Sequence, residues 1–252
     1  MTSDALPRTR LYVDADLAAG RSVALSEAQA HHLRGVLRLA PGAGLRLFNP
    51  RDGEWLARLD GLSKAGGTAL AERQLRPPAP EPDLWLCFAP VKKDAVDAVV
   101  EKGTELGAAV LQPVFTRYTD VQRVNLDRLR AHAVAAAEQS ERLDVPQVRD
   151  PVGLEALLAA WPGGRTLLVC AEAGEARPIA DAAAETSGPA ALLVGPEGGF
   201  APAELEALIR HEFVRPVGLG PRILRADTAA IAALAIWQSL AGDGCGRPPH
   251  RV

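Results

Sequence analysis

The sequence has few cysteines, which could form disulfides, and few aromatic residues, which could stack on a ligand. Its three cysteines, Cys87, Cys170 and Cys245, are odd in number and far apart, and no two form a Cys-x-x-Cys pair. A disulfide framework and a metal site are therefore not indicated, and Cys87 and Cys170, which lie in apolar runs, are predicted to be buried thiols. Aromatic residues make up only 4% of the chain, which argues against extended stacking on a single-stranded nucleic acid.

Long apolar runs are also missing. No stretch approaches the roughly 18 to 20 apolar residues of a membrane span, and the start, MTSDALPRTR, lacks the apolar core of a secretory signal. We expect a cytoplasmic protein that has no membrane partner. Hydrophobic residues at 48% and charged residues at 23% are close to average globular usage, which disfavours disorder and coiled coil.

Charge is unevenly distributed along the 252 residues. The net charge is −3, but residues 1–78 hold 11 Lys or Arg against 8 Asp or Glu, whereas the remainder holds 17 against 23. A basic amino-terminal part on an acidic body suits a protein that grips a polyanion with one part and does chemistry with the other. Ordinary scatter of surface charge explains the same counts equally well.

Prolines mark the strongest break in the chain. Four of the six residues at 77–82 are proline, which cannot donate to a sheet ladder and favours an extended spacer. We therefore predict a first domain over 1–75, a linker over 76–82 and a second domain over 83–252.

The first of these domains reads as small and rich in strands. One helix is expected to start near Ser26, a residue type that often caps helix N-termini. Turn signals such as Pro41-Gly42 and Asp52-Gly53 separate the candidate strands. These strands are Leu11–Val13, Leu45–Phe48, Glu54–Leu59 and Thr68–Glu72.

Beyond the prolines, apolar strands alternate with helical stretches. The strands are LWLCFA, VLQPVF, TLLVCA, ALLV and FVRPVGL, and the helices are expected at 93–106, 125–142, 175–186, 202–211 and 227–240. This alternation predicts an α/β domain with a parallel sheet covered by helices on both faces. Ligands of such sheets bind beyond the carboxyl ends of the strands, so the loops that follow strands are the candidate sites.

The loop after ALLV is rich in glycine. Gly195, Gly198 and Gly199 lack a β-carbon, so the segment GPEGGF can bring backbone amides and carbonyls close to a flat, neutral ligand. The spacing matches neither Gly-x-Gly-x-x-Gly nor the phosphate loop Gly-x-x-x-x-Gly-Lys-Ser/Thr, which disfavours a dinucleotide or a nucleoside triphosphate. A tight strand-to-helix turn, with Pro202 in the first helical turn, is the other interpretation.

A second loop, GLGPRILR at 218–225, carries two arginines in an apolar setting. Arginine is costly to bury unpaired, so Arg222 or Arg225 is expected to face an anion or a developing negative charge. The helix that follows is apolar almost all round and is predicted to be buried on most sides. Asp227, at its start, is typical of an N-cap.

Five segments, taken in order, resemble one known family. They are HHLRGVLRL at 31–39, EKGTELGA at 101–108, AAAEQSERLDVPQV at 135–148, LLVGPEGGF at 192–200 and LGPRILRADTAAIAAL at 219–234. Over nearly its whole length the chain resembles the bacterial 16S ribosomal RNA uridine-N3 methyltransferases of the knotted SPOUT superfamily. The resemblance implies a PUA-like β-barrel for the first domain and, for the second, a SPOUT methyltransferase domain with a carboxyl-terminal trefoil knot that forms a homodimer.

The resemblance also implies S-adenosyl-L-methionine as the cofactor and methyl donor. Four side chains are candidates for chemistry on the uridine: Arg225 to stabilise negative charge, and Asp227, Thr228 and Glu197 to orient the base or relay its proton. The family has glutamate where this chain has Asp227, which favours the capping interpretation of that residue. The cofactor would be held by Leu193, Val194, Gly195, Pro196, Glu197, Gly198, Gly199, Leu219, Gly220, Ile223 and Leu224.

Two of the resembling segments carry polar residues whose roles stay open. Glu105 is either a packing or capping residue or part of the site. Glu138, Gln139 and Arg142 lie at the end of a helix that either faces the cleft or is solvated.

Basic residues of the first domain are expected to hold the RNA. Arg8, Arg10, Arg34 and Arg38 are the predicted phosphate contacts, and the partner is 16S ribosomal RNA or the small ribosomal subunit. Two rival functions remain: a non-catalytic RNA-binding assembly factor, and a methyltransferase of related fold that acts on transfer RNA or on a ribose hydroxyl.

Overall fold

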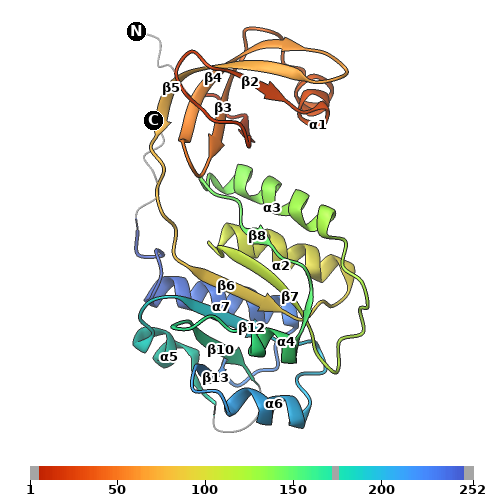
Figure 1. Ribbon diagram of the computed structural model, residues 1–252, viewed down its shortest axis with the longest axis vertical. Helices are drawn as coiled ribbons and strands as arrows, with labels where there is room; N and C mark the ends of the chain where they lie inside the picture. The colour runs from red at the N-terminus through yellow and green to blue at the C-terminus, as the bar shows by residue number, and fades with distance from the viewer. Residues whose placement is uncertain (1–5, 172–175, 247–252) are drawn as a thin grey trace. The chain divides into compact units, whose positions relative to one another are not determined.

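The computed structural model describes residues 6–171 and 176–246, which separate into two compact units (Figure 1). Residues 6–80 and 137–144 form the first unit, and the other described residues form the second. The chain thus passes from one unit to the other inside its proline-rich segment, and no pattern in the sequence indicated that 137–144 returns to the first unit. Within the described ranges, no helix has the length and apolarity needed to cross a bilayer.

The first unit is built on a curled five-stranded sheet, in which β1 pairs with β3 in parallel and the other pairs are antiparallel. Its strands, in the order β1-β3-β4-β5-β2 across the sheet, are β1 (Arg10–Tyr12), β2 (Ser22–Leu25), β3 (Gly44–Asn49), β4 (Gly53–Leu62) and β5 (Gly67–Arg76). Alternate residues such as Leu45, Leu47 and Leu59 point into one apolar core. β2 is the strand that the sequence analysis missed.

Helix α1 (Glu27–His31) begins where the sequence predicted. The Ser26 hydroxyl accepts a hydrogen bond from the Gln29 amide at 3.2 Å, and the Gln29 side chain accepts one from the Ser26 amide at 2.9 Å, so the predicted N-cap is a reciprocal capping box. A π-helical turn η1 (His32–Val36) continues the helix and buries Leu33 in the core. The rest of η1 stays exposed.

The second unit is an α/β domain with a parallel sheet, as predicted. The strand pairs recorded within its sheet are all parallel, and the order is β11-β13-β10-β12-β6-β7-β8, with β9 beside β7. The strands are β6 (Leu84–Phe88), β7 (Val110–Phe115), β8 (Gln147–Val148), β9 (Val152–Gly153), β10 (Thr166–Cys170), β11 (Arg177–Pro178), β12 (Ala190–Val194) and β13 (Val214–Gly218).

Successive residues of each strand enter different cores, because side chains alternate across a sheet. Leu192 of β12 packs with α2, α5 and α7, whereas its neighbour Leu193 packs with α4 and α6 on the opposite face. Figure 1 shows α2 and α7 together on one face and α6 on the other. The helices are α2 (Lys93–Glu105), α3 (Leu126–Ser140), α4 (Leu154–Ala159), α5 (Ile179–Glu185), α6 (Pro202–Ile209) and α7 (Ala226–Leu240).

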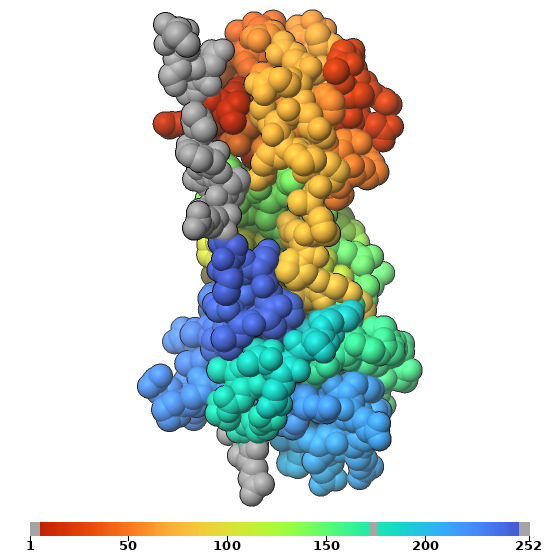
Figure 2. Space-filling view, turned by 90° about the vertical axis from the view of Figure 1, so that its left-hand side faces the viewer, coloured from red at the N-terminus to blue at the C-terminus, as the bar shows by residue number. Residues whose placement is uncertain are grey.

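Helix α7 is buried along one face only. Ala230, Leu234 and Trp237 lie in the core, and the Gln238 amide donates to the Leu106 carbonyl at 2.8 Å. Elsewhere on the helix Ala232 and Ala235 are half-buried and Leu240, at its end, is 50% exposed, which differs from the predicted burial on most sides. The surface of α7 (dark blue) lies beside that of α5 (teal) in Figure 2.

Candidate active site

The candidate site lies at the carboxyl edge of the parallel sheet. Strand order brings the ends of β13, β10, β12, β6 and β7 next to one another. Because parallel strands end at the same edge, the two loops singled out in the sequence, 195–200 and 218–225, emerge on the same side. Between them the structure holds three adjoining cavities that share Leu224.

The glycine loop makes a tight passage from β12 into α6. A β-carbon at Gly195 would stand 3.0 Å from the Phe200 ring, and Gly199 has a φ of 69°, so both positions favour glycine. The Gly199 amide donates to the Pro196 carbonyl at 2.8 Å, and Pro202 begins the helix. The loop is therefore a tight turn and a cavity wall at once, and the two interpretations of the sequence are compatible.

The second loop ends at the N-terminus of α7. Arg225 occupies the N-cap position with an extended backbone, and its carbonyl accepts from the Ala229 amide at 2.8 Å. Asp227 lies inside the first helical turn, where its carboxylate accepts from the Thr228 amide at 2.7 Å. The prediction that Asp227 is the N-cap is thus wrong by two residues, although a carboxylate in this turn still favours the helix dipole.

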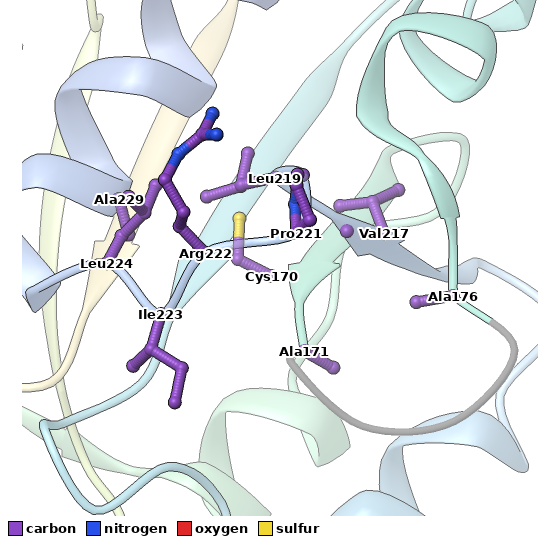
Figure 3. Close-up of a pocket in the computed structure, with 12 residues that line it drawn as sticks. Cys170, Ala171, Ala176, Val217, Leu219, Pro221, Arg222, Ile223, Leu224 and Ala229 are labelled. Carbon is purple, nitrogen blue, oxygen red and sulfur yellow. The ribbon is translucent and has the colours of Figure 1, made fainter.

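The first cavity, of about 320 Å³, lies between the end of β10 and the second loop. Cys170 and Leu219 line it together with Leu224, and in Figure 3 the Cys170 sulfur points toward the loop that carries Leu219. The side chains of Arg222 and Ile223 extend in opposite directions from that loop. Gly220, in the same wall, has a φ of 101°, which a residue with a β-carbon adopts only under strain.

A second cavity, of about 250 Å³, lies under the glycine loop and shares Cys170, Ala171, Leu224 and Ala229 with the first. Burial raises the pKa of the Cys170 thiol to about 12, so the thiol stays protonated and neutral at pH 7. Apart from Arg222 in the first cavity and Glu197 in the second, the walls are apolar side chains, a neutral thiol and loop backbone. Such walls suit a ligand that is largely uncharged where it is enclosed.

A third cavity, of about 660 Å³, is polar. Its ionisable walls are Lys92 and Asp94 at the start of α2, Glu197 of the glycine loop, and Arg225 and Asp227. Glu197 lines both this cavity and the second one, so it lies at the boundary between the second and third cavities. Arg225 is exposed and forms no ion pair with the described residues.

Most of the predicted site residues come together here. Leu193 does not line a cavity, because its side chain is buried in the core below, and Thr228 is exposed outside the three walls. The predicted residues that do line the cavities are Val194, Gly195, Pro196, Glu197, Gly198, Gly199, Leu219, Gly220, Ile223, Leu224, Arg225 and Asp227.

Sequence reasoning missed part of the wall. Lys92 and Asp94 follow β6, and Cys170 and Ala171 end β10, so they meet the same rule of loops beyond strand ends. That rule marks the loops but does not say which of them share a cavity, since the strand order is invisible in the sequence. Among the described residues, no three His, Cys, Asp or Glu side chains are grouped as around a metal ion.

The segments at 101–108 and 135–148 place their polar residues in structural roles. Glu105 pairs with Lys102 at 2.8 Å and lines none of the cavities. Gly107, with a φ of 79°, ends α2 and leaves room for Gln238, which would stand 2.4 Å from a β-carbon there. Glu138 is half-buried and accepts from the Tyr12 amide at 3.0 Å inside the first unit, so it lines none of the three cavities.

Three of the four proposed phosphate contacts are exposed. Arg8, Arg34 and Arg38 form no ion pair within the described chain, and Arg38 has a φ of 55° at the end of the η1 turn. Arg10 differs: it is 5% exposed and its guanidinium is bound to Glu54 and to the carbonyls of residues 137 and 142. Burial removes Arg10 from the predicted phosphate contacts.

Comparison with protein families covers both units. Residues 78–238 match the RNA methyltransferase domain, and residues 25–67 match the RNA methyltransferase PUA domain. The curled sheet of the first unit and the parallel sheet with its loop-lined cavities therefore define a two-domain RNA methyltransferase.

Known relatives narrow this class. Ribosomal RNA small subunit methyltransferase E of Rickettsia conorii is 34% identical over 230 residues, which cover 90% of this chain and 93% of the relative. The protein of the same name from Synechocystis is 33% identical over 90% of this chain and 76% of the relative. The crystal structure of the Neisseria gonorrhoeae protein of that name, bound to S-adenosyl methionine, is 30% identical with a TM-score of 0.84, covering 93% of this chain and 98% of that one. The chain belongs to the ribosomal RNA small subunit methyltransferase E family.

Proposed function

We propose that this protein transfers a methyl group from S-adenosylmethionine to N3 of a uridine in 16S ribosomal RNA. The observation that carries the proposal is the junction at Glu197, where a neutral, glycine-lined cavity opens into a cavity with Arg225 and two further carboxylates. The glycine-lined second cavity suits the cofactor. The charged third cavity suits a base that must lose a proton. The sum of the reaction is a new N3–methyl bond, S-adenosylhomocysteine and one proton.

The residues around the first two cavities fit this cofactor. S-adenosylmethionine, when bound, supplies a methyl group already activated on a sulfonium. Gly195, Gly199 and Gly220 stand where a side chain would clash or strain the loop, so backbone groups can approach the adenosine and methionine parts. The neutral Cys170 thiol adds no competing nucleophile or charge.

We assign the stabilisation of negative charge on the base to residues of the third cavity. Uridine N3 carries a proton at neutral pH, and loss of that proton spreads negative charge over the uracil carbonyls. We assign Arg225 to the stabilisation of this charge, because its side chain lines this cavity and no acid among the described residues engages it. Glu197 is our first candidate for the proton acceptor, because the Asp227 carboxylate already accepts from the Thr228 amide.

The first unit would grip the RNA backbone. Arg8, Arg34 and Arg38 are exposed and without acidic partners in the described chain, which leaves their charges available to phosphates. The exposed η1 turn also presents Val36, at 62% exposure, close in sequence to Arg34 and Arg38. An apolar patch within a basic surface is typical of an interaction face.

The assembled enzyme that we envisage is a cytoplasmic homodimer acting on 16S RNA or on the small subunit. The half-buried outer face of α7, with Ala232 and Ala235, supports a second copy as its cover. The trefoil knot implied by the resemblance remains part of this proposal. Ala235→Glu should convert a dimer into a monomer in analytical ultracentrifugation, and a wild-type monomer would refute this assembly.

Two measurements test the reaction itself. Isothermal titration should detect S-adenosylmethionine binding, and mass spectrometry of RNA from a deletion strain should show loss of 3-methyluridine from one small-subunit site. RNA binding without cofactor binding would favour a non-catalytic assembly factor. Loss of a different modification, in transfer RNA or on a ribose, would overturn the assignment of uridine N3.

A further inference from the structure

One aromatic side chain stands exposed beside the glycine loop. Tyr118, in the loop after β7, is 47% exposed and is the only aromatic among the large exposed apolar side chains of the described residues. The other tyrosine, Tyr12, packs edge-on against Phe48 in the first unit. In a chain with 4% aromatic residues, a ring left in solvent at a cavity edge calls for an explanation.

The loop that carries Tyr118 is held firmly. Thr116 and Thr119 join hydroxyl to hydroxyl at 2.9 Å, and the Thr116 amide donates to the Thr119 hydroxyl at 3.0 Å. The Glu204 carboxylate accepts from the Arg117 amide at 2.8 Å and from the Ala201 amide at 2.9 Å. One carboxylate therefore ties this loop to the end of the glycine loop.

The base of the Tyr118 side chain lies against Gly198. A β-carbon at Gly198 would stand 3.4 Å from the Tyr118 β-carbon and 3.8 Å from two ring atoms. Gly198 lines the second cavity beside Glu197, which also lines the third. The outer part of the ring thus stays free, at the flank of the loop that separates the cofactor space from the charged space.

We propose that Tyr118 is a stacking surface for one nucleobase of the RNA substrate. An aromatic face binds any base by stacking, and a ring on a loop that is already ordered loses little entropy when the base arrives. A single ring suits one splayed-out base rather than an extended strand. The inference rests on the proposed function, because it assumes that RNA reaches this edge of the second unit.

Three variants separate stacking from packing. Tyr118→Leu keeps the β-carbon and its branched neighbour that touch Gly198, but it removes the flat ring. Tyr118→Phe keeps the ring and removes only the hydroxyl, which makes no hydrogen bond to the described residues. Ile209→Ala truncates an apolar residue of α6 that is 59% exposed and lines none of the three cavities, so it serves as the control.

The measurements are KM and kcat for methyl transfer to a 16S RNA fragment, the Kd of the same RNA, and the Kd of S-adenosylmethionine. Tyr118→Leu should raise the RNA KM and Kd by about 5-fold to 100-fold, the span of one base–aromatic stack, with kcat and cofactor Kd unchanged. Tyr118→Phe and Ile209→Ala should match the wild type. Tyr118→Leu at wild-type RNA affinity, or with weakened cofactor binding, overturns the stacking role.

An abasic scan of the RNA identifies the partner base. At one position, removal of the base should weaken wild-type binding and abolish the difference between wild type and Tyr118→Leu. If no position has this effect, the ring stacks on no base and the inference is wrong. Should the wild type make no 3-methyluridine, the proposed function fails, and the RNA Kd values still decide the role of Tyr118.

Discussion

Arg10 and Arg46 in the first unit lie nearly buried against Glu54, whereas Arg222 and Arg225 in the second unit stand exposed beside the cavities. In the first unit Glu54 pairs with both arginines and Glu141 pairs with Arg46, and the Arg10 guanidinium also lies 3.7 Å from the Phe48 ring centroid. In the second, no acid among the described residues pairs with either arginine. Paired, dry arginines stabilise a fold, and unpaired arginines at a cavity rim remain available to a substrate.

The largest effect that would sharpen this contrast concerns stability. Glu54 is 2% exposed and pairs with Arg10, with Arg46 at 3.5 Å and with Arg76 at 2.9 Å, so Glu54→Gln leaves the buried Arg10 without an acid and leaves Arg46 with Glu141 alone, at 3.1 Å. We expect a loss of about 3–5 kcal/mol in the free energy of unfolding, measured by urea denaturation.

A matched control for this loss exists in the same sheet. Glu72→Gln breaks the exposed pair of Glu72 with Arg58, at 2.7 Å, and should lower the free energy of unfolding far less than Glu54→Gln, because solvent screens the exposed charges. Equal losses for Glu54→Gln and Glu72→Gln would show that burial does not distinguish the two pairs.

Next in size is the effect of Arg225 on turnover. Arg225→Ala should fold normally and bind S-adenosylmethionine almost as tightly as the wild type, yet lose about 10²-fold or more in kcat, because it removes a preorganised stabiliser of charge. Arg210→Ala, which removes an exposed arginine just beyond α6, should leave kcat unchanged. Wild-type turnover in Arg225→Ala would remove this residue from the catalytic set.

Filling the neutral cavity should have a moderate effect. Cys170→Met adds volume to a wall shared by the first two cavities and should weaken cofactor binding about 10-fold in isothermal titration. Cys170→Ala should bind nearly normally, and wild-type affinity should not change between pH 6 and 9 on account of this thiol, whose pKa is raised to about 12. Unaltered affinity in Cys170→Met would place the cofactor elsewhere.

The smallest effect per residue is expected from the exposed arginines of the first unit. Replacing Arg34 and Arg38 together by glutamine should lower the log–log salt slope of RNA binding by about two units, one for each phosphate contact. Arg51→Gln, which removes an exposed arginine already near Asp14 and Asp16 at 3.5 Å, is the control and should change the slope less. A slope unaffected by the double substitution would return Arg34 and Arg38 to the ordinary surface.

Local patterns predicted the elements of both units with some success. Short apolar runs that alternate with helical stretches predicted β6, β7, β10, β12 and β13, and the capping signal at Ser26 predicted the start of α1. The two-residue strands and the six-residue α4 were not predicted. Such short segments have too few residues to show a hydrophobic periodicity.

Contacts between residues far apart in the chain could not be predicted from the sequence. Arg8 and Arg10 are the same residue type with similar neighbours in the sequence. Only Arg10, however, contacts Glu54 and the backbone carbonyls of residues 137 and 142. The same limit applies to Cys170 and Lys92, whose places in the cavities depend on strand order. Glycine loops were easier to find, because positive φ and close approach restrict the residue type directly.

The return of residues 137–144 to the first unit bears on how the chain folds during synthesis. Arg10 leaves the ribosome long before the carbonyl of Ala137, its partner at 2.8 Å, has been added to the chain. Until then Arg10, Arg46, Arg76 and Glu54 can pair only among themselves, without the carbonyls and the carboxylate that 137–144 supplies. A fragment ending at Pro80 should therefore be a poor substitute for the intact first unit, and a circular permutant should keep 137–144 connected to it.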